Sequence, residues 1–382
     1  MNSYEASLRD VAVNWLRIGI TGFGGPPTHI RLLRELCVTQ KNWIDAEHFE
    51  DAVATYNLLP GPASTQLAIY SAWKVRGPLG GLIGGVLFIV PGLILILVLA
   101  ALFISRNTPK ILIAVGEGAG ATVAAIAIQA AAGLLPSSWN RRSSRSRWLL
   151  YVTSGVVAAV LFGPYLVLIL LACGFLELGW RKRPTLDRHR SLLLFVPGIP
   201  ILAKSTLLTS LIWTALKIGA LSYGGGFVII PLMRGDAVSN YHWMTSQMFL
   251  SAVALGQITP GPVVQTVAVV GYSAAGIVGG VLAAMVAFAP SFVFVLVGAR
   301  YFKRIRSNTS VRYFLDGAGP AAIGAIMGAA LPLALSLNHL WQWALLISAA
   351  IALLRFKMGV VPVILSAGVL AGVGFYIGII PL

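Results

Sequence analysis

The chain contains an internal duplication with constant spacing, and this repeat constrains the fold more than any other feature. Adding 200 to the residue number aligns Leu16-Arg17-Ile18-Gly19 with Leu216-Lys217-Ile218-Gly219, and Pro60-Gly61-Pro62 with Pro260-Gly261-Pro262. Between positions 16 and 62, 17 of 47 residues are identical to their counterparts without a gap. Compositional bias alone would hardly produce this agreement, so we predict two homologous halves built from the same elements.

Long apolar runs place both halves in a membrane. Hydrophobic residues make up 57% of the chain and charged residues 10%, whereas a soluble domain carries roughly 25% charged residues. Runs at 79–104, 277–298 and 359–380 are long enough to cross a hydrocarbon core, which takes about 20 apolar residues. The sequence therefore predicts an all-α polytopic membrane protein.

Equivalent loops of the two halves carry different positive charge. Lys and Arg in short loops favour the cytoplasm, so this difference predicts that equivalent loops lie on opposite sides of the membrane. We therefore expect an inverted repeat. The basic residues that carry this argument are Lys74, Arg76, Arg141, Arg142, Arg145 and Arg147 in the first half, and Arg300, Lys303, Arg304, Arg306, Arg312, Arg355 and Lys357 in the second.

The inversion leads to a definite topology, with residues 1–180 and 205–382 as the two transmembrane repeats. Each repeat is expected to have five crossings and one re-entrant hairpin with Pro-Gly-Pro near its tip, giving about ten transmembrane helices in all. In the first half these are a broken helix at 8–36, the hairpin at 49–73, and spans near 80–104, 111–135, 148–162 and 164–180. Residues 181–204 form a basic cytoplasmic or interfacial linker. The first residues show no signal-peptide pattern, so we expect no cleaved leader.

Several other classes of protein lack support in the sequence. The net charge of +16 comes from short loops rather than from one basic face, so no nucleic-acid partner is expected. The five histidines are scattered, and there is no paired-carboxylate, HExxH or GxxxxGK[ST] pattern. Cys37 and Cys173 have no CxxC spacing. We therefore expect no enzyme, no metal and no cofactor.

Two kinds of helix break recur at equivalent positions in the halves. Gly-rich breaks occur at Phe23-Gly24-Gly25-Pro26 and Tyr223-Gly224-Gly225-Gly226, and Pro-Gly-Pro breaks at 60–62 and 260–262. Paired interruptions of this kind point to the midplane site of a transporter. A helix that restarts after a break presents N–H groups and a positive dipole end, which attract an anion. The alternative is that the glycines only permit close helix packing.

Polar residues border the breaks and could bind the oxygens of an oxyanion. Back-bonding to the helix is their alternative role. Arg17 and Lys217, at the same repeat position in apolar segments, add charge to the predicted site, and snorkelling to the interface is the alternative. The substrate-binding residues that we predict are Arg17, Gly24, Gly25, Thr28, His29, Pro60, Gly61, Ser64, Thr65, Gln66, Lys217, Ser222, Gly224, Gly225, Gln257, Thr259, Gly261 and Gln265.

Two further symmetric pairs have other predicted roles. Arg34 and Arg234 are expected near the water interface, where they would gate the site or attract the anion. Glu117 and Asp316 precede similar Gly-Ala-Gly steps and are candidates for proton coupling, because burial favours the protonated form of a carboxylate. Capping of the following helix is an equally good explanation for this last pair.

The ordered set of motifs resembles the chromate ion transporter (CHR) family in its long, two-domain form. The resemblance rests on Phe23-Gly24-Gly25-Pro26 with His29, Pro60-Gly61-Pro62 with Gln66 and Tyr70, Gly224-Gly225-Gly226 with Pro231, Trp243, and Gln257 before Pro260-Gly261-Pro262. It covers essentially the whole chain. Asn57 departs from the pattern, since a glutamine is expected before both Pro-Gly-Pro motifs, and this weakens Asn57 as a ligand.

The resemblance implies a secondary transporter that exports chromate across a bacterial-type cytoplasmic (inner) membrane and confers chromate resistance, driven by the proton-motive force. The residues alone lead only to a small oxyanion moved by alternating access. Transport of sulfate or another oxyanion on the same scaffold is the main alternative. An anion channel and a membrane-embedded enzyme are others. The expected partners are the oxyanion and the lipid bilayer, and a homodimer remains open.

Overall fold

The structure is a computed structural model that describes residues 6–56, 61–104, 108–161, 165–182, 206–222, 227–298 and 308–381. Within these ranges all regular secondary structure is helical. Beyond Lys182, the expected linker at 181–204 lies outside the described residues. The all-helical expectation is therefore confirmed for the described part of the chain.

The first half begins with two short helices separated at Gly22–Gly25, as the glycine and proline residues there predict. Ser7 caps the first helix, because its hydroxyl accepts a hydrogen bond from the N–H of Asp10 while the Asp10 carboxylate accepts one from the N–H of Ser7. The elements are α1 (Leu8–Thr21), α2 (Pro26–Arg34), the π-helical turn η1 (Glu35–Gln40), α3 (Ala46–Tyr56), α4 (Ala63–Phe103), α5 (Lys110–Ala121), α6 (Val123–Asn140), α7 (Arg145–Leu161) and α8 (Leu166–Arg181).

The second half repeats this order. The π-helical turns η1 and η3 begin 200 residues apart, at Glu35 and Gly235. The elements are α9 (Leu207–Leu221), α10 (Ile229–Arg234), η3 (Gly235–Asn240), α11 (Ser246–Ile258), the 3-10 turn η4 (Val263–Gln265), α12 (Thr266–Gly298), α14 (Thr309–Ala334), α15 (Leu340–Ala350), η6 (Ile351–Arg355) and α16 (Val360–Tyr376).

The longest helix of each half is a hairpin rather than one straight rod. In α4 the backbone leaves helical geometry at Arg76 and at Gly77, whose φ is 65°. The two arms then pack together, since a methyl group on Gly80 would lie 2.6 Å from the carbonyl oxygen of Ala72. Helix α12 turns in the same way at Gly276, with φ 63°. The turn in α4 falls between the hairpin expected at 49–73 and the span expected at 80–104.

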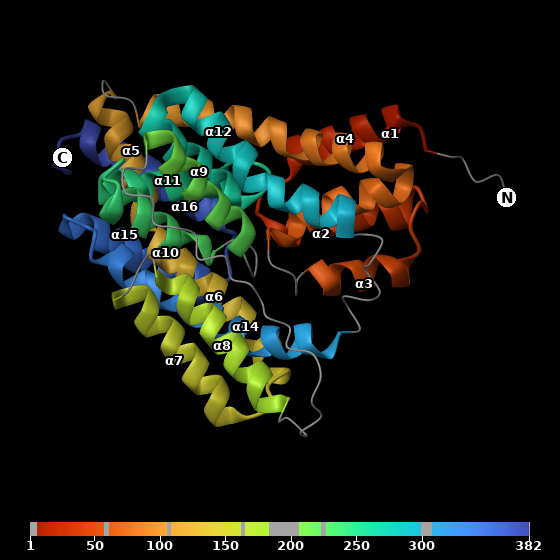
Figure 1. Cartoon of the computed structure of the whole chain (residues 1–382). Helices are drawn as coiled ribbons and strands as arrows, with labels where there is room; N and C mark the ends of the chain where they lie inside the picture. The colour runs from red at the N-terminus through yellow and green to blue at the C-terminus, as the bar shows by residue number, and fades with distance from the viewer. Residues whose placement is uncertain are drawn as a thin grey trace.

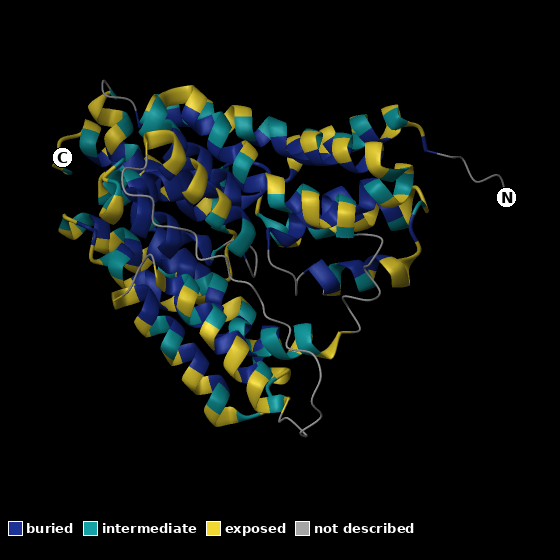
Figure 2. Ribbon diagram, in the orientation of Figure 1, coloured by how far each residue is buried: buried dark blue, intermediate teal, exposed yellow. Residues whose placement is uncertain are grey.

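Four described helical segments are long and apolar enough to cross a membrane, namely Ala63–Phe103, Lys110–Asn140, Val263–Gly298 and Thr309–Ala334. Large apolar side chains such as Ile94, Val98 and Leu102 are exposed on α4, and exposed residues alternate with buried ones along the outer helices (Figure 2). Outward-facing apolar surface of this kind is expected where the solvent is lipid. The structure thus agrees with a multi-pass membrane protein. The number of crossings and the re-entrant path stay predictions.

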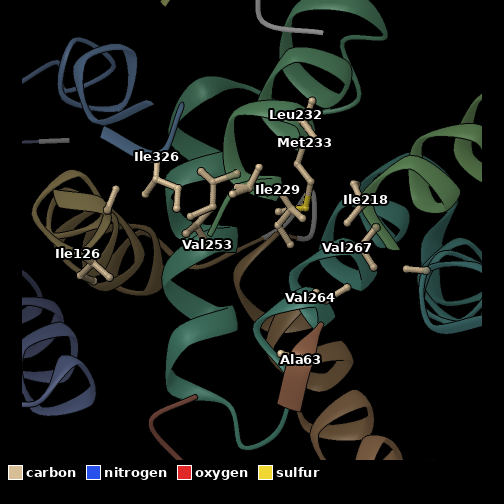
Figure 3. Packing of buried hydrophobic residues seen from close by; sticks show 14 of the residues in the cluster. Ala63, Ile126, Ile218, Ile229, Leu232, Met233, Val253, Val264, Val267 and Ile326 are labelled. Carbon is tan, nitrogen blue, oxygen red and sulfur yellow. The ribbon is translucent and has the colours of Figure 1, made fainter. Parts of the chain in front are cut away.

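The two halves are packed into each other. Figure 1 shows α1, α2 and α3 at one end of the molecule, α9 and α11 toward the other, and α4 beside α12. Helices α7 and α8 of the first half pack on α14 of the second, while α16 of the second half packs on α5 of the first. The buried core in Figure 3 accordingly mixes Ala63 and Ile126 with Ile218, Val264 and Ile326.

Candidate functional site

The Pro-Gly-Pro motif of each half is bonded to the Gly-rich break of the other. The N–H of Gly61 donates to the carbonyl oxygen of Ser222 at 2.7 Å, and the N–H of Gly261 donates to the carbonyl oxygen of Gly22 at 3.0 Å. These residues correspond under the 200-residue offset, so the two bonds are equivalent. The breaks predicted from the sequence therefore converge at the contact between the halves.

His29 supports this convergence from inside the protein. Its side chain is fully buried, and its ring lies edge-on to Phe88 at 5.0 Å between centroids. The ring Nε2 lies 2.8 Å from the carbonyl oxygen of Gly22, and because a carbonyl can only accept, Nε2 must carry the proton. His29 thus positions Gly22, which also accepts from Gly261. It does not line the cavity described below.

Other predicted polar residues are buried around the crossing. Ser64, Thr65, Gln66, Ser222, Thr259 and Gln265 are all at most 3% exposed. Within the described part, Thr65 Oγ1, Ser222 Oγ and Gln265 Oε1 have no hydrogen-bond partner. A buried polar atom without a partner costs about 1–3 kcal/mol. The centre is therefore polar and incompletely satisfied, as expected near a ligand site.

A cavity of about 1130 Å³ reaches this centre. Of the predicted site residues, Gly24, Gly25, Thr28, Gln257 and Asp316 line it. The complete lining consists of Gly24, Gly25, Pro26, Pro27, Thr28, Ile30, Ala54, Gln129, Ala130, Gly133, Leu134, Ser137, Ser138, Arg141, Arg142, Trp148, Phe227, Gln257, Val263, Leu315, Asp316, Gly319, Pro320, Ile323, Met358, Gly359 and Val360.

The inner end of the cavity lies at the first Gly-rich break and α11, where Gly24 is exposed, Gly25 and Thr28 are half-buried and Gln257 is buried. Gln257 is only 7% exposed there, and its Nε2 has no partner among the described residues. Gly24 and Gly25 adopt φ values of 97° and 73°, which only glycine adopts readily. Neither glycine N–H donates to an acceptor of the described backbone. These donors and the Thr28 hydroxyl could bind oxygen atoms of an anion.

The N-terminus of α2 differs from the expectation of several free N–H donors. Pro26 and Pro27 occupy its first two positions and have no N–H. The N–H groups of Thr28 and His29 both donate to the carbonyl oxygen of Gly25. The helix dipole remains, but at this break the free donors must come from the glycines before the helix rather than from its first turn.

The other end of the cavity is basic, which the site prediction did not include. Arg141 and Arg142 line the cavity, and the Arg142 guanidinium lies 3.6 Å from the centre of the Trp139 ring. Asp316 also lines it and pairs with Arg181 at 3.1 Å. The four-residue spacing of Gln129, Gly133, Ser137 and Arg141 is a sequence signal that could have identified this face of α6.

The two predicted central cations do not line this cavity. Arg17 is exposed on α1. Lys217 is bound in an ion pair, with 2.5 Å between its Nζ and Oδ2 of the buried Asp236. Thr214 and Asn240 also donate to that carboxylate. The residue that fixes Lys217 was not predicted from the sequence.

The other two pairs of repeat equivalents, Arg34 with Arg234 and Glu117 with Asp316, also lie in different environments. Arg34 forms a 2.8 Å ion pair with Glu50 on the surface. Arg234 is partly buried and lines a second cavity of about 340 Å³ beside Pro332 at the other end of α14. Glu117 accepts a 2.9 Å hydrogen bond from Gln342 Nε2. Pro60, Gly224 and Gly225, like Asn57, lie outside the described residues.

Sequence comparisons show which proteins the chain is similar to. The sequence profile of the chromate transporter family matches twice, at residues 9–178 and 209–373. The chain is 33% identical to the chromate transport protein of Cupriavidus metallidurans over 97% of this chain and 94% of the relative. It is 29% identical to the probable chromate transport protein of Synechococcus elongatus, over 97% of this chain and 96% of the relative. No solved structure matches. On this evidence the chain is a member of the chromate transporter family.

Proposed function

We propose that the protein exports chromate across the cytoplasmic membrane by alternating access and so confers chromate resistance. The observation that carries the proposal is the cavity that connects arginine residues at one end with the repeated helix breaks at the centre. Relatives named as chromate transport proteins, aligned over nearly their full length, support the choice of ion.

The proposed ligands at the inner end of the cavity are neutral donors. They are the N–H groups of Gly24 and Gly25, the Thr28 hydroxyl and the Gln257 amide, all at the cavity lining. Chromate is a tetrahedral dianion, and hydrogen bonds to a charged acceptor contribute about 1.5–3 kcal/mol each. A few such bonds, with the positive end of the α2 dipole, hold the ion without the tight binding that several cations would give. Release in each cycle requires this moderate affinity.

An asymmetry between equivalent contacts supports alternating access by inverted halves. Helix α11 of the second half packs closely on α5 of the first, where a methyl group on Gly120 would lie 2.9 Å from Leu250 Cβ. Their repeat counterparts, α3 of the first half and α14 of the second, are instead separated by the cavity, which Ala54 and Gly319 both line. Exchange of these two arrangements between the halves would close the present opening and create one on the other side.

The charge of the loops indicates the side of the membrane to which the cavity opens. Arg141 and Arg142 belong to a basic loop, which the positive-inside rule places in the cytoplasm. The cavity of the present state would then open to the cytoplasm, where an exported anion must enter. Arg234, which lines the smaller cavity at the other end of α14, would attract the anion or gate it on the exit side.

The proton-motive force is the proposed energy source, and Glu117 is the better of the two candidate carboxylates. Asp316 is neutralised by Arg181. Within the described part, Glu117 has no Lys or Arg in ion-pair distance and is held by the Gln342 amide. A carboxylate without a cation can bind and release a proton during the cycle more easily than a paired one.

Sulfate transport is the second candidate function, because sulfate has the same charge and shape as chromate. A site made of neutral donors and one helix dipole distinguishes the two ions only by size. Competition between the ions therefore decides the substrate.

The test is uptake of labelled chromate into inside-out membrane vesicles that contain the protein, with protein-free vesicles as control. Saturable uptake that unlabelled chromate inhibits more strongly than sulfate is the expected result. Saturable uptake of sulfate without uptake of chromate would show that the protein is a sulfate transporter. Uptake that is not accelerated by unlabelled ion on the opposite side would indicate a channel.

A further inference from the structure

We propose that the oxyanion reaches the buried site along one face of α6, from a docking site formed by Arg141 and Arg142. This inference rests on the proposed function and adds the place where the anion first binds. The relevant residues form two adjacent rows along the helix, and every member lines the cavity. The rows are Gln129, Gly133, Ser137 and Arg141, and Ala130, Leu134, Ser138 and Arg142.

The four-residue spacing places each row on a single helix face. Both rows begin within α6, at Gln129 and Ala130, and end in an arginine at the loop before α7. Exposure falls along the first row, because Arg141, Ser137 and Gly133 are exposed and Gln129 is half-buried, and Gln257 at the inner end is 7% exposed. An anion that enters beside Arg141 therefore passes from a hydrated, charged end to a buried, neutral one.

Neither docking arginine forms an ion pair within the described part of the chain, although the Asp316 carboxylate interacts electrostatically with Arg141. The nearby carboxylates are occupied elsewhere, since Glu177 pairs with Arg147 and Arg181, and Asp316 pairs with Arg181. No described acidic group forms an ion pair with Arg141 or Arg142. The excess positive charge at this end attracts a dianion and raises its local concentration.

Arg142 is held in a defined position, which favours a site over a diffuse charge. Its Nη1 donates to the carbonyl oxygen of Trp139 at 2.6 Å, and its guanidinium lies over the same residue's ring. Trp139 is in turn fixed edge-on against Trp148 at 4.9 Å. A guanidinium has five N–H donors, so most remain for two oxygens of a tetrahedral oxyanion. A lipid phosphate offers the same chemistry, and the experiment separates the two.

The first test uses labelled chromate and inside-out vesicles with the double variant Arg141→Gln/Arg142→Gln. We expect KM to rise about tenfold with a maximal rate within about twofold, because attraction is lost while the buried site is intact. Added salt should raise KM of the unmodified protein and leave that of the variant nearly unchanged. The matched control Arg145→Gln/Lys182→Gln removes two exposed charges outside the cavity lining.

An unchanged KM in the double variant, or an equal rise in the control, overturns the docking site. A double variant with normal KM whose transport no longer depends on the anionic-lipid content of the vesicles would show that the arginines bind lipid phosphate. These three results are distinct from failure of the proposed function, in which the unmodified protein would not transport chromate at all.

A second test concerns the route and does not depend on the arginines. A side chain built on Gly133 meets no atom within 4 Å, and the same is true of Gly179 on the exposed face of α8. Gly133→Trp should fill the route and reduce transport by more than tenfold, whereas Gly179→Trp should leave it unchanged. Normal transport in Gly133→Trp would show that chromate does not pass along α6.

Discussion

The N–H of Gly61 donates a 2.7 Å hydrogen bond to the carbonyl oxygen of Ser222 and so joins the Pro-Gly-Pro motif of one half to the Gly-rich break of the other. Gly61 has φ 109°, and a methyl group there would collide with the side-chain amide of Gln66. Backbone strain and steric conflict therefore act together at this position.

Gly61→Ala should lower both thermal stability in detergent and chromate transport. The matched control is Gly77→Ala, at the α4 turn, where φ is also positive but a methyl group meets no atom within 4 Å. Strain alone costs about 1 kcal/mol, so the control should lose little stability and keep its transport. Equal effects of the two substitutions would show that the link between the halves has no special role.

The Lys217–Asp236 ion pair should contribute to thermal stability, and the equivalent positions of the first half show how it can be replaced. Lys217→Met leaves the buried carboxylate unpaired and should cost about 3–5 kcal/mol of stability. At the equivalent of Asp236 the first half has Leu36, so Lys217→Met/Asp236→Leu should restore most of the thermal stability.

Arg17→Ala is the matching control, since exposed substitutions usually change stability by less than about 0.5 kcal/mol. Thermal unfolding in detergent and chromate uptake are measured on all variants. If the double variant is stable but inactive, Lys217 has a transport role beyond pairing with Asp236.

These residues also show what the sequence could and could not predict. Breaks at Gly24-Gly25 and Gly61 follow from local backbone chemistry, so their positions were predicted correctly. Repeat equivalence predicts one role for Arg17 and Lys217, but their environments differ because the neighbouring position holds Leu36 in the first half and Asp236 in the second. For Arg141 and Arg142 the sequence predicts only loop charge, because the cavity that they line is formed by elements distant in the sequence.

Gln257 and Gln265 should respond in opposite ways to removal of the amide. Nε2 of Gln257 has no described partner at the cavity, whereas Nε2 of Gln265 donates to the carbonyl oxygen of Ile89 at 2.7 Å. Gln257→Leu should raise KM for chromate about tenfold, which corresponds to about 1.4 kcal/mol, without loss of stability. Gln265→Leu should instead lower the unfolding temperature, because the hydrogen bond to Ile89 is lost. A normal KM in Gln257→Leu would remove this amide from the binding site.

Glu117→Gln tests the energy source. The substitution keeps the size of the side chain but cannot bind a proton, so uptake into inside-out vesicles should no longer be accelerated by a pH gradient. Exchange of labelled for unlabelled chromate needs no net proton movement and should continue. Asp316→Asn, which removes one of the two carboxylate partners of Arg181, serves as the comparison. Retained acceleration in Glu117→Gln would assign coupling to another group.

Helix α11 packs on α5, whereas the equivalent helices α3 and α14 are separated by the cavity. The proposed transport cycle exchanges these two arrangements, so a disulfide across either helix pair should trap one state. A side chain built on Gly116 places Cβ 3.6 Å from Cβ of Ser251, within the range of about 3.5–4.5 Å for a disulfide. In a background where the buried Cys37 and Cys173 are replaced by Ala, Gly116→Cys/Ser251→Cys should cross-link readily. The disulfide should hold the cavity open to the arginine side and stop transport until it is reduced.

The Gly-Ala-Gly steps after Glu117 and Asp316 align with an offset of 199. The repeat equivalents of Gly116 and Ser251 are therefore Leu315 and Asp51, which belong to helices on either side of the cavity. Leu315→Cys/Asp51→Cys should cross-link only when the protein cycles, and added chromate should increase the yield because the ion promotes the exchange of states. Full transport by the oxidised Gly116→Cys/Ser251→Cys protein would contradict the mechanism, since α11 could then not leave α5. A cross-link between positions 315 and 51 that forms equally fast without chromate would show instead that the two states exchange freely in the empty protein.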